Sequence, residues 1–243
     1  NLSQVPSGGA YAFSVRIPSG LVKYSVQCGS VNGMTTNSLG TATNLVCGDA
    51  YIIEGQSNAV ATDSLPSETT TSPWIRSYGW SGGGWGSALR NGTQWWIGSW
   101  GWDLATNLVG SYNMPICIIN GAVGGTRIDQ HQANPANHYV ADSYGNTIYA
   151  NLLNRVAGAN LTHGIRAILW HQGENNSAAD SPTGTWDYLS YQQYFVDMSA
   201  AWKQDYPNVR HYNIFQVCPN PCSMGGKESA DMLREVQRTL PRL

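Results

Sequence analysis

Residues 47–59, with the sequence CGDAYIIEGQSNA, decide the fold of this chain. Residues 50–54 form a short apolar run, which is typical of a strand that is covered on both faces of a parallel sheet. Gly55 and a polar segment follow this run at once, and Ser57 is placed to open a helix. The segment therefore predicts a strand, a sharp turn and a helix.

The same pattern recurs further along the chain. Apolar runs at residues 115–120, 165–170 and 212–217 predict three more strands. Helices are expected at residues 102–109, 147–157, 187–204 and 227–239; the third carries Tyr191, Phe195, Met198 and Trp202 at helical spacing. Strands that alternate with helices predict an α/β fold, a doubly wound and mostly parallel sheet flanked by helices.

The first 46 residues follow a different pattern. Residues 10–17 and 21–27 are strand-like, are separated by Gly, Ser and Pro, and show no helical periodicity. We therefore expect residues 1–46 to form a β-rich N-terminal segment, too small for an independent domain. Residues 47–243 would form the main domain.

The composition excludes several classes of protein. Charged residues make up 12% of the 243 residues, about half the roughly 25% usual for a soluble domain. There is no apolar run of the ~18 residues that span a bilayer, and no basic block that would follow phosphates, so neither membrane nor nucleic acid is expected as a partner. A charge-poor chain with 10 Trp suits a secreted protein that handles neutral polysaccharides, although structural Trp residues would give the same composition.

The five cysteines suggest an oxidising compartment. Cys28 with Cys47, and Cys218 with Cys222, could each close a loop, whereas Cys117 lies in an apolar run and is expected to be a buried thiol. Two disulfides would fit a secreted or otherwise extracytoplasmic protein, and five reduced thiols remain the alternative. The cysteine spacing is not that of a zinc site, so no metal is expected.

Polar, glycine-containing segments follow three of the predicted strands. They are residues 55–58, 121–126 and 171–174. Ligands of open α/β sheets bind beyond the carboxyl ends of the strands, where these segments would converge. The sequence therefore predicts the functional site at this edge.

The residue types in these segments suit acyl transfer. Ser57 at the start of a helix would face backbone N–H groups that can stabilise an oxyanion, although a serine there can simply cap the helix. Gly124 and Gly125 let a backbone N–H approach a ligand, or form an ordinary turn. Gln172 offers an amide donor, and Glu174 could orient a histidine or bind a hydroxyl; both could equally be structural.

Taken together, the three segments resemble a known superfamily. CGDAYIIEGQSNA, INGAVGGTRI and ILWHQGENN are similar, in this order, to motifs of the SGNH hydrolases. The nearest resemblance is to their carbohydrate acetylesterase branches, the sialate O-acetylesterase-like family and carbohydrate esterase family 6. It covers roughly residues 45–240, with a weaker match in FQV and LREVQRTL. Residues 1–46 resemble the end of the β-rich region that precedes GQSN in the former family.

The resemblance implies a role for each matching residue. Ser57 would be the nucleophile, and the backbone N–H groups of Ser57 and Gly124 with the side-chain amide of Gln172 would form the oxyanion hole. Glu174 would support the site, and no cofactor is required. Three further residues are candidates for substrate binding: Asn58, Arg127 and His171. Arg127 could equally be a structural ion-pair partner.

The general base that Ser57 needs is not identifiable. The family supplies a histidine in a D-x-x-H box, and this sequence contains none. The base could lie beyond Leu243, in which case the domain is incomplete at its C-terminus. Alternatively another histidine was recruited, with His171 the nearest and His131 and His138 as further candidates, or the chain is not catalytic.

The sequence therefore predicts a serine esterase that removes O-acetyl groups from sugars or polysaccharides. Six of the Trp residues between the first two motifs crowd together in sequence and could form a platform for sugar rings: Trp80, Trp85, Trp95, Trp96, Trp100 and Trp102. A non-catalytic carbohydrate-binding homologue and a lipase-like SGNH esterase are the alternatives. The particular sugar and the oligomeric state are not readable from the sequence.

Overall fold

The structure is a computed structural model that describes residues 12–62, 70–177, 188–219 and 227–240. The chain divides into two compact units, Asn1–Cys47 and Gly48–Leu243.

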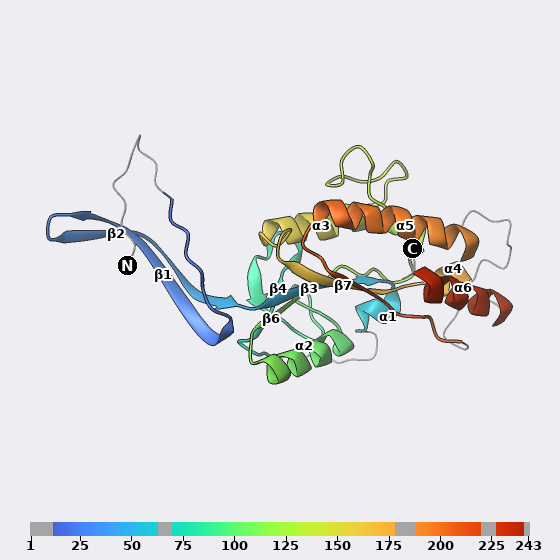
Figure 1. The fold of residues 1–243 in the computed structure, drawn as a ribbon, viewed down its shortest axis with the longest axis horizontal. Coiled ribbons are helices and arrows are strands. Elements are labelled where there is room, and N and C mark those ends of the chain that lie inside the picture. Colours follow the sequence, from blue (N-terminus) through green and yellow to red (C-terminus); the bar gives the residue numbers. More distant parts are fainter. Residues whose placement is uncertain (1–11, 63–69, 178–187, 220–226, 241–243) are drawn as a thin grey trace. The chain divides into compact units, whose positions relative to one another are not determined.

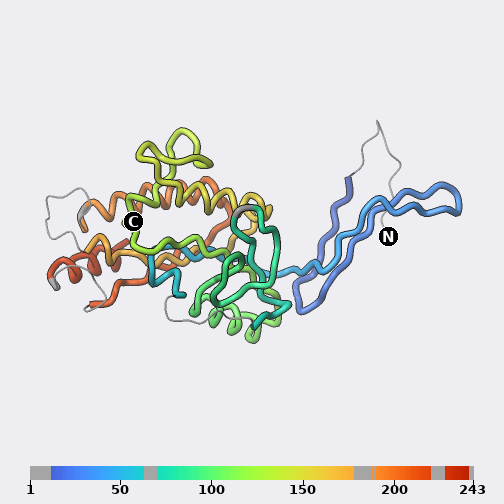
Figure 2. The backbone as a smooth tube through the Cα atoms, turned by 180° about the vertical axis from the view of Figure 1, so that it is seen from behind, coloured from blue at the N-terminus to red at the C-terminus, as the bar shows by residue number. Residues whose placement is uncertain are grey.

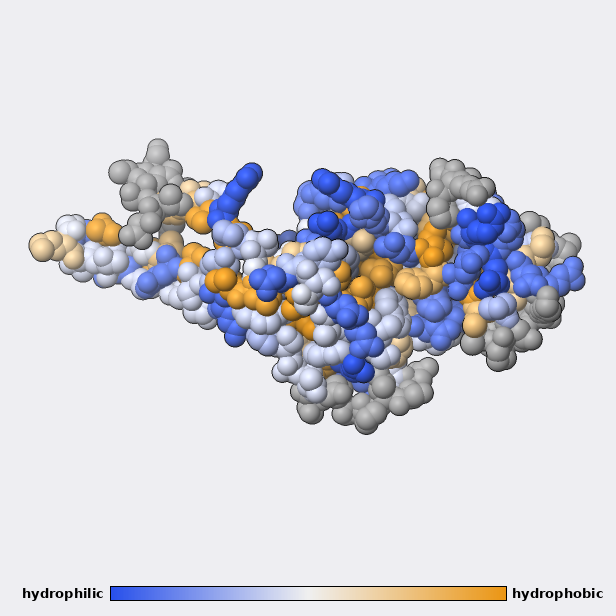
Figure 3. All heavy atoms as spheres, turned by 60° about the horizontal axis from the view of Figure 1, so that its bottom comes forward, coloured by the Kyte–Doolittle hydropathy of each residue, from blue (hydrophilic) through white to orange (hydrophobic). Residues whose placement is uncertain are grey.

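The first unit is an antiparallel hairpin. Strand β1 (Gly20–Asn32) pairs with β2 (Thr35–Cys47), and Gly33 takes a positive φ of 59° in the connecting turn. Apolar side chains such as Val22 and Val31 lie on its surface, and apolar patches are visible on the hairpin in Figure 3. The strand expected at residues 21–27 falls within β1, whereas residues 12–17 form no strand and β2 was not predicted.

The second unit is built on a six-stranded sheet. Its strands are β3 (Asp49–Gly55), β4 (Ile75–Tyr78), β5 (Trp85–Ser87), β6 (Ile116–Asn120), β7 (Ile165–His171) and β8 (His211–Ile214). They lie in the order β5-β4-β6-β3-β7-β8, and only the β4–β5 pair is antiparallel. This arrangement confirms the predicted, mostly parallel α/β sheet.

Helices cover both faces of this sheet. The helices are α1 (Ser57–Val60), α2 (Ser99–Tyr112), α3 (Ile148–Gly158), α4 (Glu174–Ser177), α5 (Tyr188–Asp205) and α6 (Lys227–Thr239), with short 3-10 turns η1 (Trp80–Gly82) and η2 (Ile128–His131). Figure 1 shows α2 on one side of the strands and α3 and α5 on the other, and Figure 2 shows the same from behind. None of the helices in the described ranges has the length and hydropathy of a membrane span.

The core has two halves because successive residues of a strand point to opposite faces. On β3, fully buried Ile52 packs in the cluster that contains Trp170 and Trp202, on the side of α3 and α5. The next residue, Ile53, packs in a second cluster with Trp102 of α2. Burial on both faces is why the central strands appear in the sequence as continuous apolar runs.

The structure corrects one cysteine prediction. In the hairpin, Cys28 pairs with Gly40 and Cys47 pairs with Gly20, so the two cysteines lie eight positions apart along the ladder. Eight residues of extended chain span ~27 Å, far beyond the Cα separation of a disulfide. The expected Cys28–Cys47 bond is therefore wrong, and Cys47 is a free thiol. The expected Cys218–Cys222 bond involves Cys222, which lies outside the described residues.

The remaining cysteine prediction, the buried thiol of Cys117, is confirmed. Cys117 lies in β6 and is 9% exposed. Burial raises the pKa of this thiol to about 12. Since the thiolate is the reactive form, Cys117 is protected both by packing and by its protonation state.

This protection leads to a prediction for alkylation at pH 8. With iodoacetamide, the native protein is expected to be labelled at half-buried Cys47 but not at Cys117. In about 8 M urea both cysteines are expected to be labelled, because unfolding restores an ordinary thiol pKa. Peptide mass spectrometry measures the two sites separately. Native labelling of Cys117 at the rate of Cys47 would contradict the packing of β6.

Candidate active site

Three loops meet at the carboxyl edge of the sheet. They follow the neighbouring strands β3, β6 and β7. The backbone N–H of Val123 donates to the carbonyl of Gly55 at 3.0 Å, and the N–H of Gln56 donates to the carbonyl of His171 at 3.1 Å. The structure thus brings together the three segments that the sequence places after strands.

Ser57 opens α1 directly after a sharp turn. Gly55 has a φ of +137°, and a Cβ there would lie 2.0 Å from the carbonyl oxygen of His171, so only glycine fits. Gln56 holds the N-cap position and Ser57 is the first helical residue, with no side-chain cap bond. The alternative in which Ser57 serves as the helix cap therefore does not hold.

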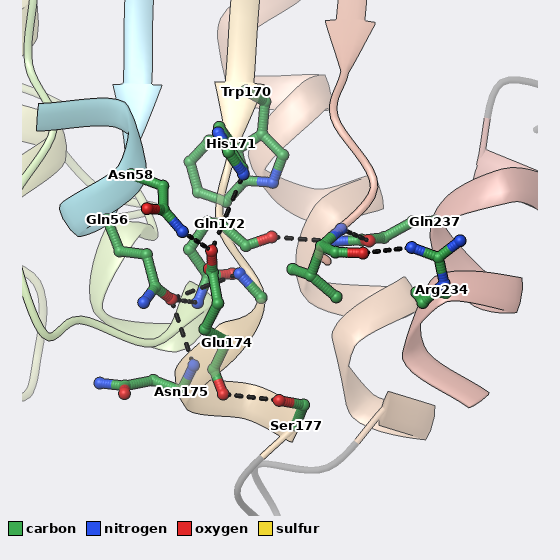
Figure 4. Close-up of polar contacts among 12 residues, drawn as sticks. Gln56, Asn58, Trp170, His171, Gln172, Glu174, Asn175, Ser177, Arg234 and Gln237 are labelled. Atoms are coloured by element: carbon green, nitrogen blue, oxygen red, sulfur yellow. Dashed lines mark hydrogen bonds and ion pairs between the residues drawn. The ribbon is translucent and has the colours of Figure 1, made fainter. Parts of the chain in front are cut away.

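The side chain of Gln56 is the hub of the site. It is 1% exposed, and its Oε1 accepts three hydrogen bonds, from Gln172 Nε2 at 3.1 Å and from the backbone N–H groups of Gly173 at 3.3 Å and Asn175 at 3.2 Å. Figure 4 shows this carboxamide between the loops. The residue belongs to the GQSN motif, but sequence reasoning assigned it no role.

Gln172 ties the same loops together from β7. Its side chain is fully buried, and Nε2 lies within hydrogen-bond distance of Gln56 Oε1, of the Thr126 carbonyl at 3.0 Å and of Asn176 Oδ1 at 2.8 Å. An amide nitrogen carries two hydrogens, so these three acceptors already saturate it. In this structure the amide binds the protein itself, and the oxyanion role expected for Gln172 stays a prediction.

Glu174 links two of the predicted substrate-binding residues. Its Oε1 accepts a hydrogen bond from Asn58 Nδ2 and lies 3.7 Å from His171 Nε2 (Figure 4). Burial lowers the pKa of His171, and the nearby Glu174 carboxylate partly opposes this shift. A lowered pKa keeps the imidazole neutral at pH 7, which is the form that can accept a proton.

The loop after β6 presents Gly124 to solvent. Gly124 is exposed with open space around its Cα, and the carbonyl of the next residue, Gly125, accepts a hydrogen bond from Asn175 Nδ2. Further along this loop, Arg127 donates to both carboxylate oxygens of Asp129, each at 3.0 Å. The ion-pair alternative for Arg127 is thus observed, and its substrate role stays a prediction.

Two other candidate histidines are engaged elsewhere. His131 is fully buried, with Nε2 at 2.8 Å from Thr126 Oγ1 and Nδ1 at 3.2 Å from Glu54 Oε1. His138 is bonded to Asp205, the last residue of α5, at 2.7 Å. His171 is paired with Gly55 in the sheet register and keeps part of its side chain exposed, whereas His131 is completely buried beneath the loop after β6.

The six Trp residues do not form one platform. Trp80 stacks on Trp96, Trp85 lies edge-on to Tyr78, and Trp102 is buried. Trp95 donates to the Gly84 carbonyl. Trp100 contacts the site, through a 2.9 Å hydrogen bond from Nε1 to the carbonyl of Asn58.

The structure also contains a separate cleft of about 330 Å³ at the end of β4. Tyr78, Trp80 and Arg155 line it, and the Arg155 guanidinium lies 4.2 Å from the centre of the Trp80 ring. Of the residues predicted to form the functional site, Trp80 of the expected platform lines this cleft, whereas Ser57, Gly124, Gln172 and Glu174 do not. Across the described ranges, no group of three or more His, Cys, Asp or Glu residues is arranged to hold a metal ion.

The carboxylate of Glu174 gives a testable effect on His171. In Glu174→Gln the negative charge is lost, so the pKa of His171 is expected to fall further below its usual value. An NMR titration of the histidine ring carbons measures this shift. Asp205→Asn, which removes the carboxylate beside His138, is the matched control. The pKa of His171 is expected to be unchanged in this variant. An unchanged His171 titration in Glu174→Gln would show that the two groups are not coupled.

Solved structures of other proteins share the fold of this chain. The chain resembles a solved protein from Arabidopsis thaliana at 20% identity and a TM-score of 0.56, over 79% of this chain and 81% of that one. It also resembles a solved carbohydrate acetylesterase from Xanthomonas citri at 20% identity and a TM-score of 0.61, over 85% of this chain but only 50% of that one. These likenesses show a shared fold.

The family comparison is more specific. No curated protein matches the chain. The model of a family described as carbohydrate esterase, sialic acid-specific acetylesterase, matches residues 48–238, which include all three loops. The chain therefore belongs to this family of carbohydrate acetylesterases.

Proposed function

We propose that the protein is a serine esterase that removes O-acetyl groups from sugars through an acetyl-enzyme on Ser57. The observation that carries the proposal is the position of Ser57, at the first turn of α1 and directly after β3, in a chain of the acetylesterase family. The turn at Gly55 packs against the backbone of His171, and this contact positions the residues that follow, including Ser57. A nucleophile on a tight strand-to-helix turn is reachable by an ester carbonyl at the sheet edge.

In this proposal the reaction has two steps. Ser57 Oγ attacks the acetyl carbonyl, the C–O bond to the sugar breaks, and the sugar hydroxyl leaves with the serine proton. Water then attacks the acetyl-serine, and acetate leaves while Ser57 regains its proton. Each step passes through a tetrahedral oxyanion, and each well-placed donor to that oxygen is worth about 3–4 kcal/mol.

The proposed oxyanion donors are the backbone N–H groups of Ser57 and Gly124 and the amide of Gln172. Exposure of Gly124 in the loop after β6 supports its assignment. Gln172 would have to exchange one of its three present acceptors for the oxyanion. Glu174 holds Asn58 through its Oε1 and acts as a positioning residue, with Asn58, His171 and Arg127 as proposed substrate contacts.

The base that takes the Ser57 proton is proposed to be an imidazole. His171 lies at the right edge and its lowered pKa favours the neutral ring, whereas the D-x-x-H histidine of the family is absent from residues 1–243. The variant His171→Ala tests whether His171 is the base. A fall in kcat as deep as that of Ser57→Ala assigns the base to His171, and a shallower fall shows that His171 is not the base.

The substrate of the proposed reaction is an O-acetylated sugar. The family description names sialic acid, and the near-neutral charge of this chain also suits a neutral polymer such as xylan. An extracytoplasmic location is proposed on composition, since the expected Cys28–Cys47 disulfide no longer supports it. Initial rates on acetylated sialic acid and acetylated xylan identify the preferred sugar.

Ser57→Ala tests the proposal directly. Wild-type protein is expected to hydrolyse p-nitrophenyl acetate and to be labelled by a fluorophosphonate at Ser57, because both reactions need the serine oxygen as nucleophile. The variant is expected to lose the label and about 10³-fold or more of kcat/KM. Ser38→Ala, an exposed serine of β2, is the matched control.

Other outcomes assign other functions. Glycan binding by the wild-type protein without ester turnover and without labelling would indicate the non-catalytic homologue. A preference for long acyl esters over acetates would indicate the lipase-like esterase. Either result would contradict the proposed sugar acetylesterase.

A further inference from the structure

Three aromatic rings from separate elements meet beside the proposed nucleophile. They are Trp100 at the start of α2, His171 at the end of β7 and Phe215 just after β8, and we call them the aromatic shelf. The ring centres of Trp100 and Phe215 are 5.4 Å apart at an interplanar angle of 48°, and those of His171 and Phe215 are 5.4 Å apart at 24°. The three rings therefore form a continuous row.

The backbone fixes this row to the catalytic loop. Trp100 donates from Nε1 to the carbonyl of Asn58, the residue after Ser57. His171 is paired with Gly55 in the β3–β7 register. The backbone N–H of Phe215 donates to the carbonyl of Trp170 at 2.9 Å, which continues the sheet pairing beyond β8. Each ring is thus placed by main-chain contacts at the same edge that carries the nucleophile.

Trp100 of the aromatic shelf is partly buried and packs against the core cluster that contains Ile53 and Trp102, whereas Phe215 and His171 reach the surface. Phe215 is 38% exposed and His171 keeps 21% of its side chain exposed, whereas Trp170 and Trp202 in the core are almost completely buried. The part of Phe215 that remains exposed contributes no hydrophobic free energy in the free protein. A ligand that covered it would recover that free energy.

Polar groups border the same rings. The Glu174 carboxylate lies 3.7 Å from His171 Nε2, and the carboxamide of Asn58 is bonded to that carboxylate. Aromatic side chains together with a few fixed polar groups are typical of small-ligand sites. A pyranose has the matching chemistry, since one face presents C–H groups and its rim presents hydroxyls.

We infer that the aromatic shelf binds the pyranose ring that carries the acetyl ester, with Phe215 as the main stacking partner and Trp100 beside it. The inference rests on the proposed function, because it names where the sugar lies when its ester reaches Ser57. It makes Phe215, which lies in the weakly matching FQV segment and was assigned no role there, a determinant of specificity for cyclic sugars over simple acetates.

The test compares two acetate esters. One is an acetylated methyl xylopyranoside, and the other is ethyl acetate, which has no ring to stack. In Phe215→Leu, which keeps an apolar side chain but removes the aromatic face, the ratio of kcat/KM for the xyloside to kcat/KM for ethyl acetate is expected to fall about tenfold, mainly through KM. Phe215→Trp, which restores a ring, is expected to keep the ratio within about twofold of wild type.

Tyr112→Leu is the matched control. Tyr112 is 65% exposed at the end of α2, opposite to the Trp100 end. In Tyr112→Leu, the ratio of kcat/KM for the xyloside to kcat/KM for ethyl acetate is expected to equal that of the wild type. If Phe215→Leu does not fold, as judged by circular dichroism, Trp100→Phe is used for the test. The same ratio is expected to fall, because phenylalanine presents a smaller ring and has no N–H to donate to the carbonyl of Asn58.

The outcomes separate this inference from the function on which it rests. An unchanged ratio in a folded Phe215→Leu, or a fall that Phe215→Trp does not restore, would overturn the stacking role while leaving the esterase intact. Absence of turnover and of Ser57 labelling in the wild type would overturn the proposed function itself, and the inference with it.

Discussion

The three hydrogen bonds accepted by Gln56 Oε1 are the constraint on which the site depends. This one oxygen joins the β3 loop to Gln172, Gly173 and Asn175 of the β7 loop. Gln172 in turn donates a hydrogen bond to the carbonyl of Thr126 in the loop after β6. A buried donor that loses its acceptor costs about 1–3 kcal/mol, so removal of this oxygen would disturb all three loops together.

This polar network explains how the sheet edge can hold a reactive turn. Ser57 lies between Gln56, which faces the protein interior, and Asn58, which is bonded to Glu174. Beneath the β6 loop, the buried pair Glu54 and His131 supports Thr126. The proposed nucleophile and the proposed oxyanion donors are therefore held by hydrogen bonds behind them, while the aromatic shelf provides an apolar surface beside them.

Much of the fold was predictable because the central strands are buried on both faces. Their apolar runs, and the helical spacing in residues 187–204, are strong local signals that the structure confirms in β7 and α5. The short strand β4 and the exposed hairpin strand β2 carry no such pattern, and the register that separates Cys28 from Cys47 is a long-range property. The role of Gln56 and the aromatic shelf were hidden for the same reason, since Trp100 and Phe215 meet only after folding.

The most direct test of the account is a crystal structure of the protein after reaction with a fluorophosphonate. We predict that the phosphorus is bonded to Ser57 Oγ, with a phosphoryl oxygen within about 3 Å of the backbone nitrogens of Ser57 and Gly124, where a tetrahedral oxyanion would lie. A phosphonate attached to another residue, or a Ser57 adduct whose phosphoryl oxygen points to solvent away from Gly124, would contradict it.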